Sequence, residues 1–389
     1  LVNHITPYGP EKTLIFAAND LHADDVVVWL TSEFELANME VDDDKALAAQ
    51  QTNFTVLRLR RAFLSRGSLG GIFTRRSAST VGPGSNEVFG LDANVGLRRY
   101  VNFGGYVAKS RTEGLTGDSL SYRGQFNYDH DRYGLELDRL VVEENFNPEV
   151  GFMRRRNFRR SYAQGRFSPR TENNRLVRKW TYQASLDYIT DNDNRLASRE
   201  ARAEFQTDFH SGDIVSLAAV SAHESLPQAF AIQGVRIPPG GYNFTTGVLS
   251  YTAGQHHRIA GVMSFEAGGF YGGTRKTVSY LGRIEISPRL GIEPNISQNW
   301  IDVPQGTFTT TLVGARTTLT ITPRMFVAAL VQYTSGSSSL SSNVRLRWEY
   351  RPGSELFLVY TEGRSTLPVR GTELQSRGIV LKINRLFRF

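Results

Sequence analysis

The chain contains no cysteine among its 389 residues, so neither disulfide bonds nor thiolate metal sites stabilise it. Long apolar runs are missing too: the longest, residues 325–331 (MFVAALV), is far shorter than the roughly 20 residues that a membrane-spanning helix requires. If this chain crosses a membrane, it therefore does so as strands. Its mean hydropathy of -0.32 is compatible with that, since only every second residue of a transmembrane barrel strand faces lipid.

Several functional motifs are also missing. Residues 1–12 (LVNHITPYGPEK) show no secretory signal, so the signal was removed or the chain starts within a longer protein. The phosphate-cradling GxxxxGK[ST] loop is absent, which argues against a nucleotide motor. The adjacent His256 and His257 lack partners at metal-ligand spacing, and residues 191–194 (DNDN) lack the glycine and glutamate of a calcium loop. We expect no cofactor and no metal.

Alternating strand patterns are what the sequence does contain. From Thr52 onward, segments of about ten residues alternate between apolar and polar side chains, as in transmembrane barrels. One segment sets Leu120, Tyr122, Phe126 and Tyr128 against Ser121, Arg123, Gln125 and Asn127. No helical pattern interrupts the repetition up to residue 389. The sequence predicts an all-β fold, a large antiparallel transmembrane β-barrel over residues 52–389.

The connections between these segments are predicted to be short and long in strict alternation. Barrels of this type place short turns on the periplasmic side and long loops outside. Short turns are expected at residues 65–67, 98–100, 129–131, 169–175, 210–213, 255–257, 287–289, 322–324 and 352–354. Long connections are expected at residues 77–86, 111–118, 141–157, 190–197, 223–242, 268–276, 300–306, 335–340 and 365–375.

The strand count is predicted to be odd. These breaks give about 19 strands, whereas single-chain bacterial barrels have even numbers. The first and last strands would then run the same way and could not close an antiparallel wall. We therefore expect that N-terminal strands are missing and that the barrel is truncated.

The C-terminal residues 377–389 (RGIVLKINRLFRF) form a strand pattern with one apolar face. Ile379, Leu381, Ile383, Phe387 and Phe389 share that face, which Arg385 interrupts. A closing strand that ends in Phe resembles the terminal signature of bacterial outer-membrane barrels. The resemblance implies recognition by the barrel-insertion machinery through Phe389.

Residues 1–51 read differently and are predicted to be a short non-barrel α/β segment, foreign to the barrel or a plug. An apolar run is followed by helical character at residues 22–37 (HADDVVVWLTSEFELA) and by an acidic cluster at residues 40–44. No strand is expected there to pair with the first barrel strand. Residues 12–34 resemble a fragment of type I restriction-enzyme motor subunits, but no ATPase activity follows from so short a match.

Residues 52–389 resemble the barrel region of a bacterial outer-membrane family of unassigned function. The motifs that carry the resemblance are TNFTVLRLRR (52–61), FNPEVGFMRR (146–155), FYGG (270–273), SSNVRLRWEYRPGSELFLVY (341–360) and the terminal KINRLFRF. Members of this family usually carry a carbohydrate-binding-module-family-nine-like domain upstream. That domain is not present in this chain, which puts carbohydrate binding by the chain itself in doubt.

Two groups of charged residues are candidate ligand sites. One is the cluster Arg154, Arg155, Arg156, Arg159 and Arg160, whose guanidiniums suit lipopolysaccharide phosphate or another anion; its alternative is a loop folded inward and paired with carboxylates. The other is a set predicted to face the lumen: Glu200, Arg202, Glu204, Asp208, Arg345, Arg347 and Glu349. Such a lumen would be a water-filled pathway or a self-neutralising network that seals it.

We expect the protein to reside in the bacterial outer membrane and not to be an enzyme. Its expected function is passage or surface capture of a solute, with a saccharide as the candidate class. The alternatives are a hydrolase acting on surface glycans and a sealed structural or adhesion barrel. Expected partners are outer-membrane lipid, lipopolysaccharide and the insertion machinery. Nucleic acid is not expected despite the net charge of +7, because the arginines are spread over many strands.

Overall fold

The computed structural model describes residues 26–30, 52–63, 66–367 and 372–387. All 22 elements in these ranges are strands. Twenty are sheet strands, and the remaining two form a separate hairpin. One sheet strand precedes residue 52, so 19 lie in the predicted barrel region, and the all-β antiparallel prediction and its strand count are confirmed.

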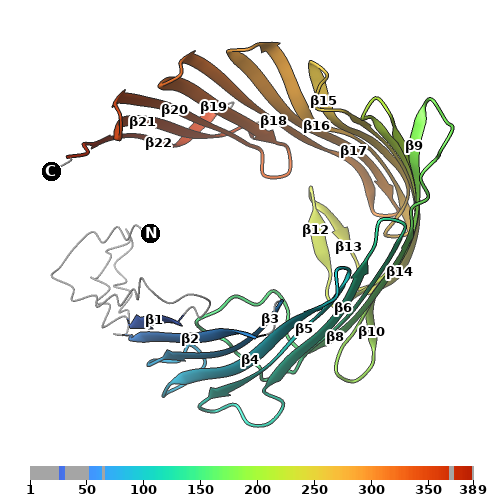
Figure 1. Ribbon diagram of the computed structural model, residues 1–389, viewed down its shortest axis with the longest axis vertical. Coiled ribbons are helices and arrows are strands. Elements are labelled where there is room, and N and C mark those ends of the chain that lie inside the picture. The colour runs from blue at the N-terminus through green and yellow to red at the C-terminus, as the bar shows by residue number, and fades with distance from the viewer. Residues whose placement is uncertain (1–25, 31–51, 64–65, 368–371, 388–389) are drawn as a thin grey trace. The chain divides into compact units, whose positions relative to one another are not determined.

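The chain divides into two compact units, unit 1 (residues 1–165 and 186–198) and unit 2 (residues 166–185 and 199–389). In unit 1, strands β1 to β7 pair antiparallel in chain order and lie side by side (Figure 1). The strands are β1 (Val26–Leu30), β2 (Phe54–Phe63), β3 (Gly67–Arg76), β4 (Asn86–Leu97), β5 (Val101–Thr112), β6 (Leu120–Asp129), β7 (Tyr133–Val142) and β8 (Phe158–Phe167). The ends of β9 (Val177–Thr190) and β10 (Leu196–Phe209) also belong to this unit.

Unit 2 contains the rest of β9 and β10 and ten further sheet strands of 10 to 17 residues. These are β11 (Ile214–Leu226), β14 (Gly240–Ala253), β15 (Ile259–Phe270), β16 (Gly273–Ser287), β17 (Leu290–Val303), β18 (Gly306–Thr322), β19 (Met325–Thr334), β20 (Ser339–Arg351), β21 (Ser354–Ser365) and β22 (Glu373–Asn384). From β11 and β14 onward each pairs antiparallel with the next. Between β11 and β14 the chain forms the small hairpin of β12 (Phe230–Ile232) and β13 (Val235–Ile237).

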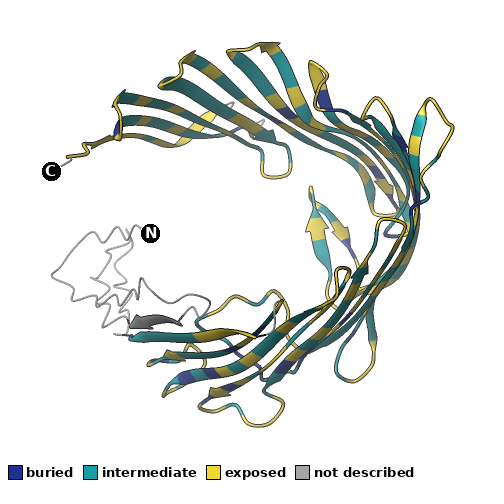
Figure 2. Cartoon of the chain, viewed as in Figure 1, coloured by how far each residue is buried: buried dark blue, intermediate teal, exposed yellow. Residues whose placement is uncertain are grey.

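Apolar side chains are exposed on one face of each unit, and polar side chains are buried on the other. In unit 1, Tyr122 is 42% exposed whereas its neighbour Ser121 is 1% exposed. In unit 2, Phe205 is 38% exposed whereas Asp208, on the opposite face of the same strand, is 3% exposed. Buried residues lie singly or in adjacent pairs along the chain (Figure 2). The predicted alternation is confirmed, and the distribution is the reverse of that in water-soluble domains.

The predicted connections lie at the strand ends, but several differ in length from the prediction. The expected long connections at 335–340 and 190–197 have only four and five residues, whereas the expected short turn at 169–175 spans nine residues, 168–176. Residues 98–100 and 210–213 separate β4 from β5 and β10 from β11, as expected. The expected long connections at 268–276 and 300–306 are instead two-residue turns, Tyr271 with Gly272 and Pro304 with Gln305. Tyr271 (φ 42°) and Gly272 (φ 82°) both adopt the left-handed conformation that tight hairpin turns need. The alternation of short and long connections therefore does not hold throughout.

The N-terminal segment does supply a strand, contrary to expectation. Val26–Leu30 (VVVWL) forms β1 within the stretch where helical character is expected, and it pairs antiparallel with Thr55 to Leu59 of β2. Three valines and an aromatic residue have high strand propensity, and the edge of β2 offers unpaired backbone groups to an added strand. With β1, the described residues form 20 sheet strands, an even number. The rest of residues 1–51, including the acidic cluster, lies outside the described residues.

The C-terminal strand has the predicted apolar face but ends earlier than expected. Ile379, Leu381 and Ile383 are 60–70% exposed and lie opposite Tyr360, Leu358 and Leu356 of β21. Strand β22 stops at Asn384, where the Leu386 N–H donates instead to Ser354 Oγ at 3.1 Å. The prediction that the strand continues through residue 387 is therefore wrong, and Phe389 lies outside the described residues.

Candidate functional site

The β12–β13 hairpin of unit 2 packs against the sheet through an apolar cluster. Gln233 (φ 52°) and Gly234 (φ 81°) form its tight turn, and Ile237 is fully buried against Tyr271, Ile301 and Val303. These three residues lie at the two connections that are unexpectedly short. At one of them Gly306 approaches Val235 so closely that an added Cβ would lie 3.2 Å from its Cγ2. Short turns at this end of β15–β18 therefore leave room for the hairpin.

A pocket of about 400 Å³ lies on the same polar face of unit 2 and shares Tyr271 with the hairpin cluster. We call it the hairpin pocket. Its lining residues are Glu200, Arg202, Val220, Ala222, Glu224, Phe244, Thr246, Val248, Glu266, Gly269, Phe270, Tyr271 and Arg275. They come from β10, β11, β14, β15, β16 and the turn between β15 and β16, so the pocket combines three carboxylates, two guanidiniums and three aromatic rings.

The charges of the hairpin pocket are only partly paired. Arg275 forms an ion pair with Glu266, and Arg202 pairs with Glu204 at 2.9 Å along its own strand. Glu224 accepts a hydrogen bond of 2.8 Å from the Tyr271 hydroxyl. Glu200 has no ion-pair partner among the described residues. Two carboxylates thus remain uncompensated, which makes the pocket acidic.

Tyr271 anchors this arrangement from the turn between β15 and β16. Its ring makes T-shaped contacts with Phe230, Tyr242, Phe244 and Phe270 at centroid distances of 4.7–5.3 Å. Burial and, after it, the hydrogen bond to Glu224 raise the pKa of the Tyr271 phenol. The phenol therefore stays protonated at neutral pH and acts as a donor that orients Glu224.

The remaining residues predicted to face the lumen do not line this pocket. Asp208 of β10 lies 3.4 Å from Arg178 and 3.5 Å from Lys179. Arg347 pairs with Glu355 and lies over the rings of Phe326 and Phe357, each 5.9 Å away. Glu349 accepts a hydrogen bond from the Gly353 N–H at 2.9 Å, and Arg345 is exposed. The structure therefore brings together Glu200 and Arg202 with Glu204 beside them, but not the β20 residues.

Unit 1 carries an ion-pair ladder on its polar face. Asp138, with a side chain only 2% exposed, accepts from Arg123 at 2.6 Å and lies 3.4 Å from Arg160. Arg160 continues to Asp187 at 2.8 Å. Two carboxylates and two guanidiniums thus compensate one another across β6, β7, β8 and β9.

The five arginines of residues 154–160 are not one cluster. Arg160 belongs to the ladder, whereas Arg159 donates to Asn192 at 3.2 Å and to Asn194 at 3.0 Å. Arg156 donates to Asn147 at 2.5 Å, Arg155 lies over the Phe158 ring at 5.9 Å, and Arg154 is exposed. Alternation separates Arg159 from Arg160, because adjacent residues of β8 point to opposite faces. Arg154, Arg155 and Arg156 lie in the connection before β8.

The described residues hold no group of three or more His, Asp or Glu side chains able to bind a metal. His257 instead contacts Asp213 at 2.9 Å in a turn region. Hydrogen bonds from the Gly254 N–H first, and then from Ser211 and His257, hold the pKa of Asp213 below its usual range. Among the described residues, no helix is long and apolar enough to cross a membrane.

Sequence reasoning missed Glu224, Glu266, Arg275 and Tyr271. The only sequence signal near them is the FYGG stretch, which contains Tyr271. Comparison with protein-family models gives no match, and no curated protein matches the chain. Assignment of function therefore depends on the geometry of the residues.

Proposed function

We propose that residues 52–389 form the wall of a β-barrel in a bacterial outer membrane. The observation that supports this best is the exposure of the apolar face together with burial of the polar face in both units. A face carrying Leu91 (61% exposed) and Phe103 (43%) in unit 1, and Met263 (57%) and Phe265 (47%) in unit 2, is an aggregation hazard in water but suits lipid. The resemblance of these residues to an outer-membrane barrel family is part of the same proposal.

The function that the polar face supports best is non-enzymatic capture or passage of a polar solute at the hairpin pocket. Uncompensated Glu200 and Glu224 disfavour anions and accept hydrogen bonds from hydroxyl or ammonium groups. Phe244, Phe270 and Tyr271 add apolar surface beside them. Hydroxyl-rich solutes with apolar ring faces match this combination, so a neutral saccharide is the proposed ligand class.

Membrane placement is testable with the native tryptophans. Trp300 and Trp348 lie on the apolar face and are 47% and 44% exposed. In vesicles of lipids with brominated acyl chains, contact with the chains is expected to quench their fluorescence strongly. Trp300→Phe and Trp348→Phe variants assign the signal. Fluorescence as bright as in unbrominated vesicles would contradict the proposal.

Solute capture is testable by equilibrium binding of an oligosaccharide panel to the full chain in micelles, with conductance in planar bilayers as the second readout. Glu224→Gln is expected to weaken saccharide binding about tenfold, since hydrogen bonds to a charged acceptor contribute about 1.5–3 kcal/mol. Arg345→Gln, which alters a charge outside the pocket, is the matched control. Turnover of a glycan would favour the hydrolase, and silence in both assays would favour a sealed barrel.

A further inference from the structure

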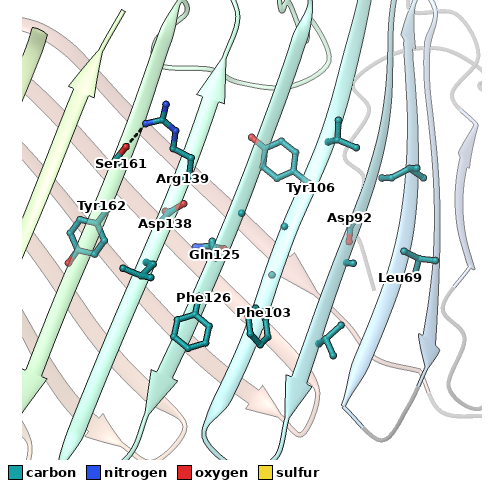
Figure 3. A pocket seen from close by; sticks show the side chains of 18 residues that line it. Leu69, Asp92, Phe103, Tyr106, Gln125, Phe126, Asp138, Arg139, Ser161 and Tyr162 are labelled. Carbon is teal, nitrogen blue, oxygen red and sulfur yellow. Dashed lines mark hydrogen bonds between the residues drawn. The ribbon is translucent and has the colours of Figure 1, made fainter. Parts of the chain in front are cut away.

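The exposed apolar face of unit 1 contains a hollow of about 760 Å³. It follows one row of register partners across four strands: Ala93 of β4, Gly105 of β5, Gly124 of β6 and Arg139 of β7. We call this the Gly–Arg row. Three of its members have a methyl group or no side chain, and the fourth is Arg139, labelled in Figure 3.

Bulky apolar side chains border the Gly–Arg row on both sides. Toward the long connections the neighbouring row is Leu91, Val107, Tyr122 and Val141, and toward the short turns it is Val95, Phe103, Phe126 and Leu137. The Phe103 and Phe126 rings contact each other with centroids 5.0 Å apart. The row is therefore a groove with apolar walls, and missing side chains create its depth.

Glycine is required at one of the two positions and not at the other. A Cβ added to Gly105 would lie 2.6 Å from the Arg123 carbonyl oxygen, so a side chain is excluded there. A Cβ added to Gly124 meets nothing within 4 Å. A larger side chain at position 124 can thus fill the hollow without a clash, so a substitution there tests whether the hollow binds a ligand.

Arg139 is the cation at one end of this groove. Its guanidinium is exposed and donates to the Ser161 hydroxyl, and no carboxylate among the described residues lies within ion-pair distance of it. Arg139 lies three residues before the end of β7 at Val142, whereas Ala93 lies seven residues after the start of β4 at Asn86. Both strand ends meet long connections, so the row rises toward that side as it approaches Arg139.

A partner for this groove must be apolar along most of its length and anionic at the end near the long connections. We propose that the Gly–Arg row binds the lipid A part of lipopolysaccharide, with one acyl chain over Gly105 and Gly124 and a phosphate on Arg139. The arginine fork suits phosphate, and exposed Lys109, on the same face of β5, adds a second cation. This inference rests on the proposed outer-membrane placement, in which long connections face outside.

The test is native mass spectrometry of the full chain refolded in zwitterionic micelles and titrated with bis-phosphorylated lipid A. The unaltered chain is expected to retain one lipid. Arg139→Gln and Gly124→Leu are each expected to weaken retention at least tenfold. Matched controls are Gly165→Leu, a position with nothing within 4 Å of an added Cβ, and Lys276→Gln, whose register partner is Trp300 on the apolar face of unit 2. Both controls are expected to retain lipid as the unaltered chain does.

Three results would overturn the proposal. The first is that all variants retain lipid A as well as the unaltered chain does. The second and third are that the unaltered chain retains dephosphorylated lipid A, or phosphatidylglycerol, as well as it retains bis-phosphorylated lipid A; the phosphatidylglycerol result would make the groove a general phospholipid site. Tryptophan quenching by brominated lipid is measured on the same preparations. A chain that is quenched but retains no lipid A overturns only this site. A chain that is not quenched overturns the membrane placement itself. If Gly124→Leu does not refold, Arg139→Gln still decides the outcome.

Discussion

The polar faces of the two units handle charge in opposite ways. In unit 1, Arg123, Asp138, Arg160 and Asp187 form a ladder in which carboxylates and guanidiniums balance. In unit 2, the part of the chain that the structure describes gives Glu200 of the hairpin pocket no ion-pair partner, and it gives Glu224 a hydrogen bond from the Tyr271 phenol. The charges of the ladder are already paired with one another, so they contribute little to ligand binding. Uncompensated carboxylates beside aromatic rings can bind a ligand. The difference locates the candidate solute site in unit 2.

The largest effect is expected from separating the hairpin from the sheet. Ile237→Asp would bury a carboxylate in an apolar cluster, which costs several kcal/mol of desolvation free energy. The packing of a three-residue strand against the sheet is too small to offset that cost. We expect the hairpin to undock, saccharide binding to disappear and amide hydrogen exchange of residues 230–237 to rise. Ala231→Asp, at an exposed position of β12, is the control and should change none of these. Slow exchange in the Ile237→Asp variant would contradict the packing described.

Removing a charge should lower the unfolding free energy when the charge belongs to the ladder but not when it belongs to the hairpin pocket. Asp138→Asn leaves Arg123 and Arg160 without their shared carboxylate. Since both guanidiniums are about one-third exposed, we expect a loss of about 1–3 kcal/mol in unfolding free energy, below the cost of a fully buried pair. Glu200→Gln, which breaks no pair, should leave stability within about 0.5 kcal/mol. Urea unfolding in micelles measures both, and equal losses would remove the contrast between the two units.

Tyr271→Phe sharpens the comparison inside the pocket. The variant keeps the aromatic contacts but removes the hydroxyl that donates to Glu224. We expect stability to fall by about 1 kcal/mol and saccharide binding to weaken several-fold, because Glu224 loses its fixed orientation. Tyr242→Phe, which removes a hydroxyl bonded to the Pro238 carbonyl oxygen, is the matched control for binding. Equal weakening by both variants would show that the Glu224 contact has no special role.

The smallest expected effect concerns pH and the connection that contains Glu149. Burial opposes the shift, but hydrogen bonds from Ser79, Thr80 and Asn147 hold the pKa of Glu149 below its usual value. A lowered carboxyl pKa means that the contact stabilises the fold above the unfolded pKa, about 4.3, and is lost as pH falls through the lower folded value. Hydrogen exchange of residues 143–157 should therefore rise at acidic pH, after correction for intrinsic rates, and Glu149→Gln should show raised exchange already at neutral pH. Unchanged exchange in that variant would rule out this anchoring.

Local pattern was sufficient for the strands and insufficient for the connections. Alternation marks β6 and β22 because side-chain direction in a strand has a period of two, which can be read from neighbouring residues alone. At Tyr271 and Gly272 the sequence predicts a long loop and the structure has a tight turn, because glycine-rich sequence suits both a loop and a tight left-handed turn. Likewise, the local pattern around VVVWL predicts a helix, because the partner that makes this segment a strand is β2, about thirty residues away in sequence.

The sequence by itself determined the all-β class, the two-faced strands and the number of described sheet strands after residue 52. The tertiary structure alone decided which residues meet: Glu224 with Tyr271, Glu266 with Arg275, and Gly105 with Gly124 and Arg139. Register is the physical reason. A shift of one residue between paired strands would send each of these side chains to the opposite face, and nothing within a single strand specifies that shift.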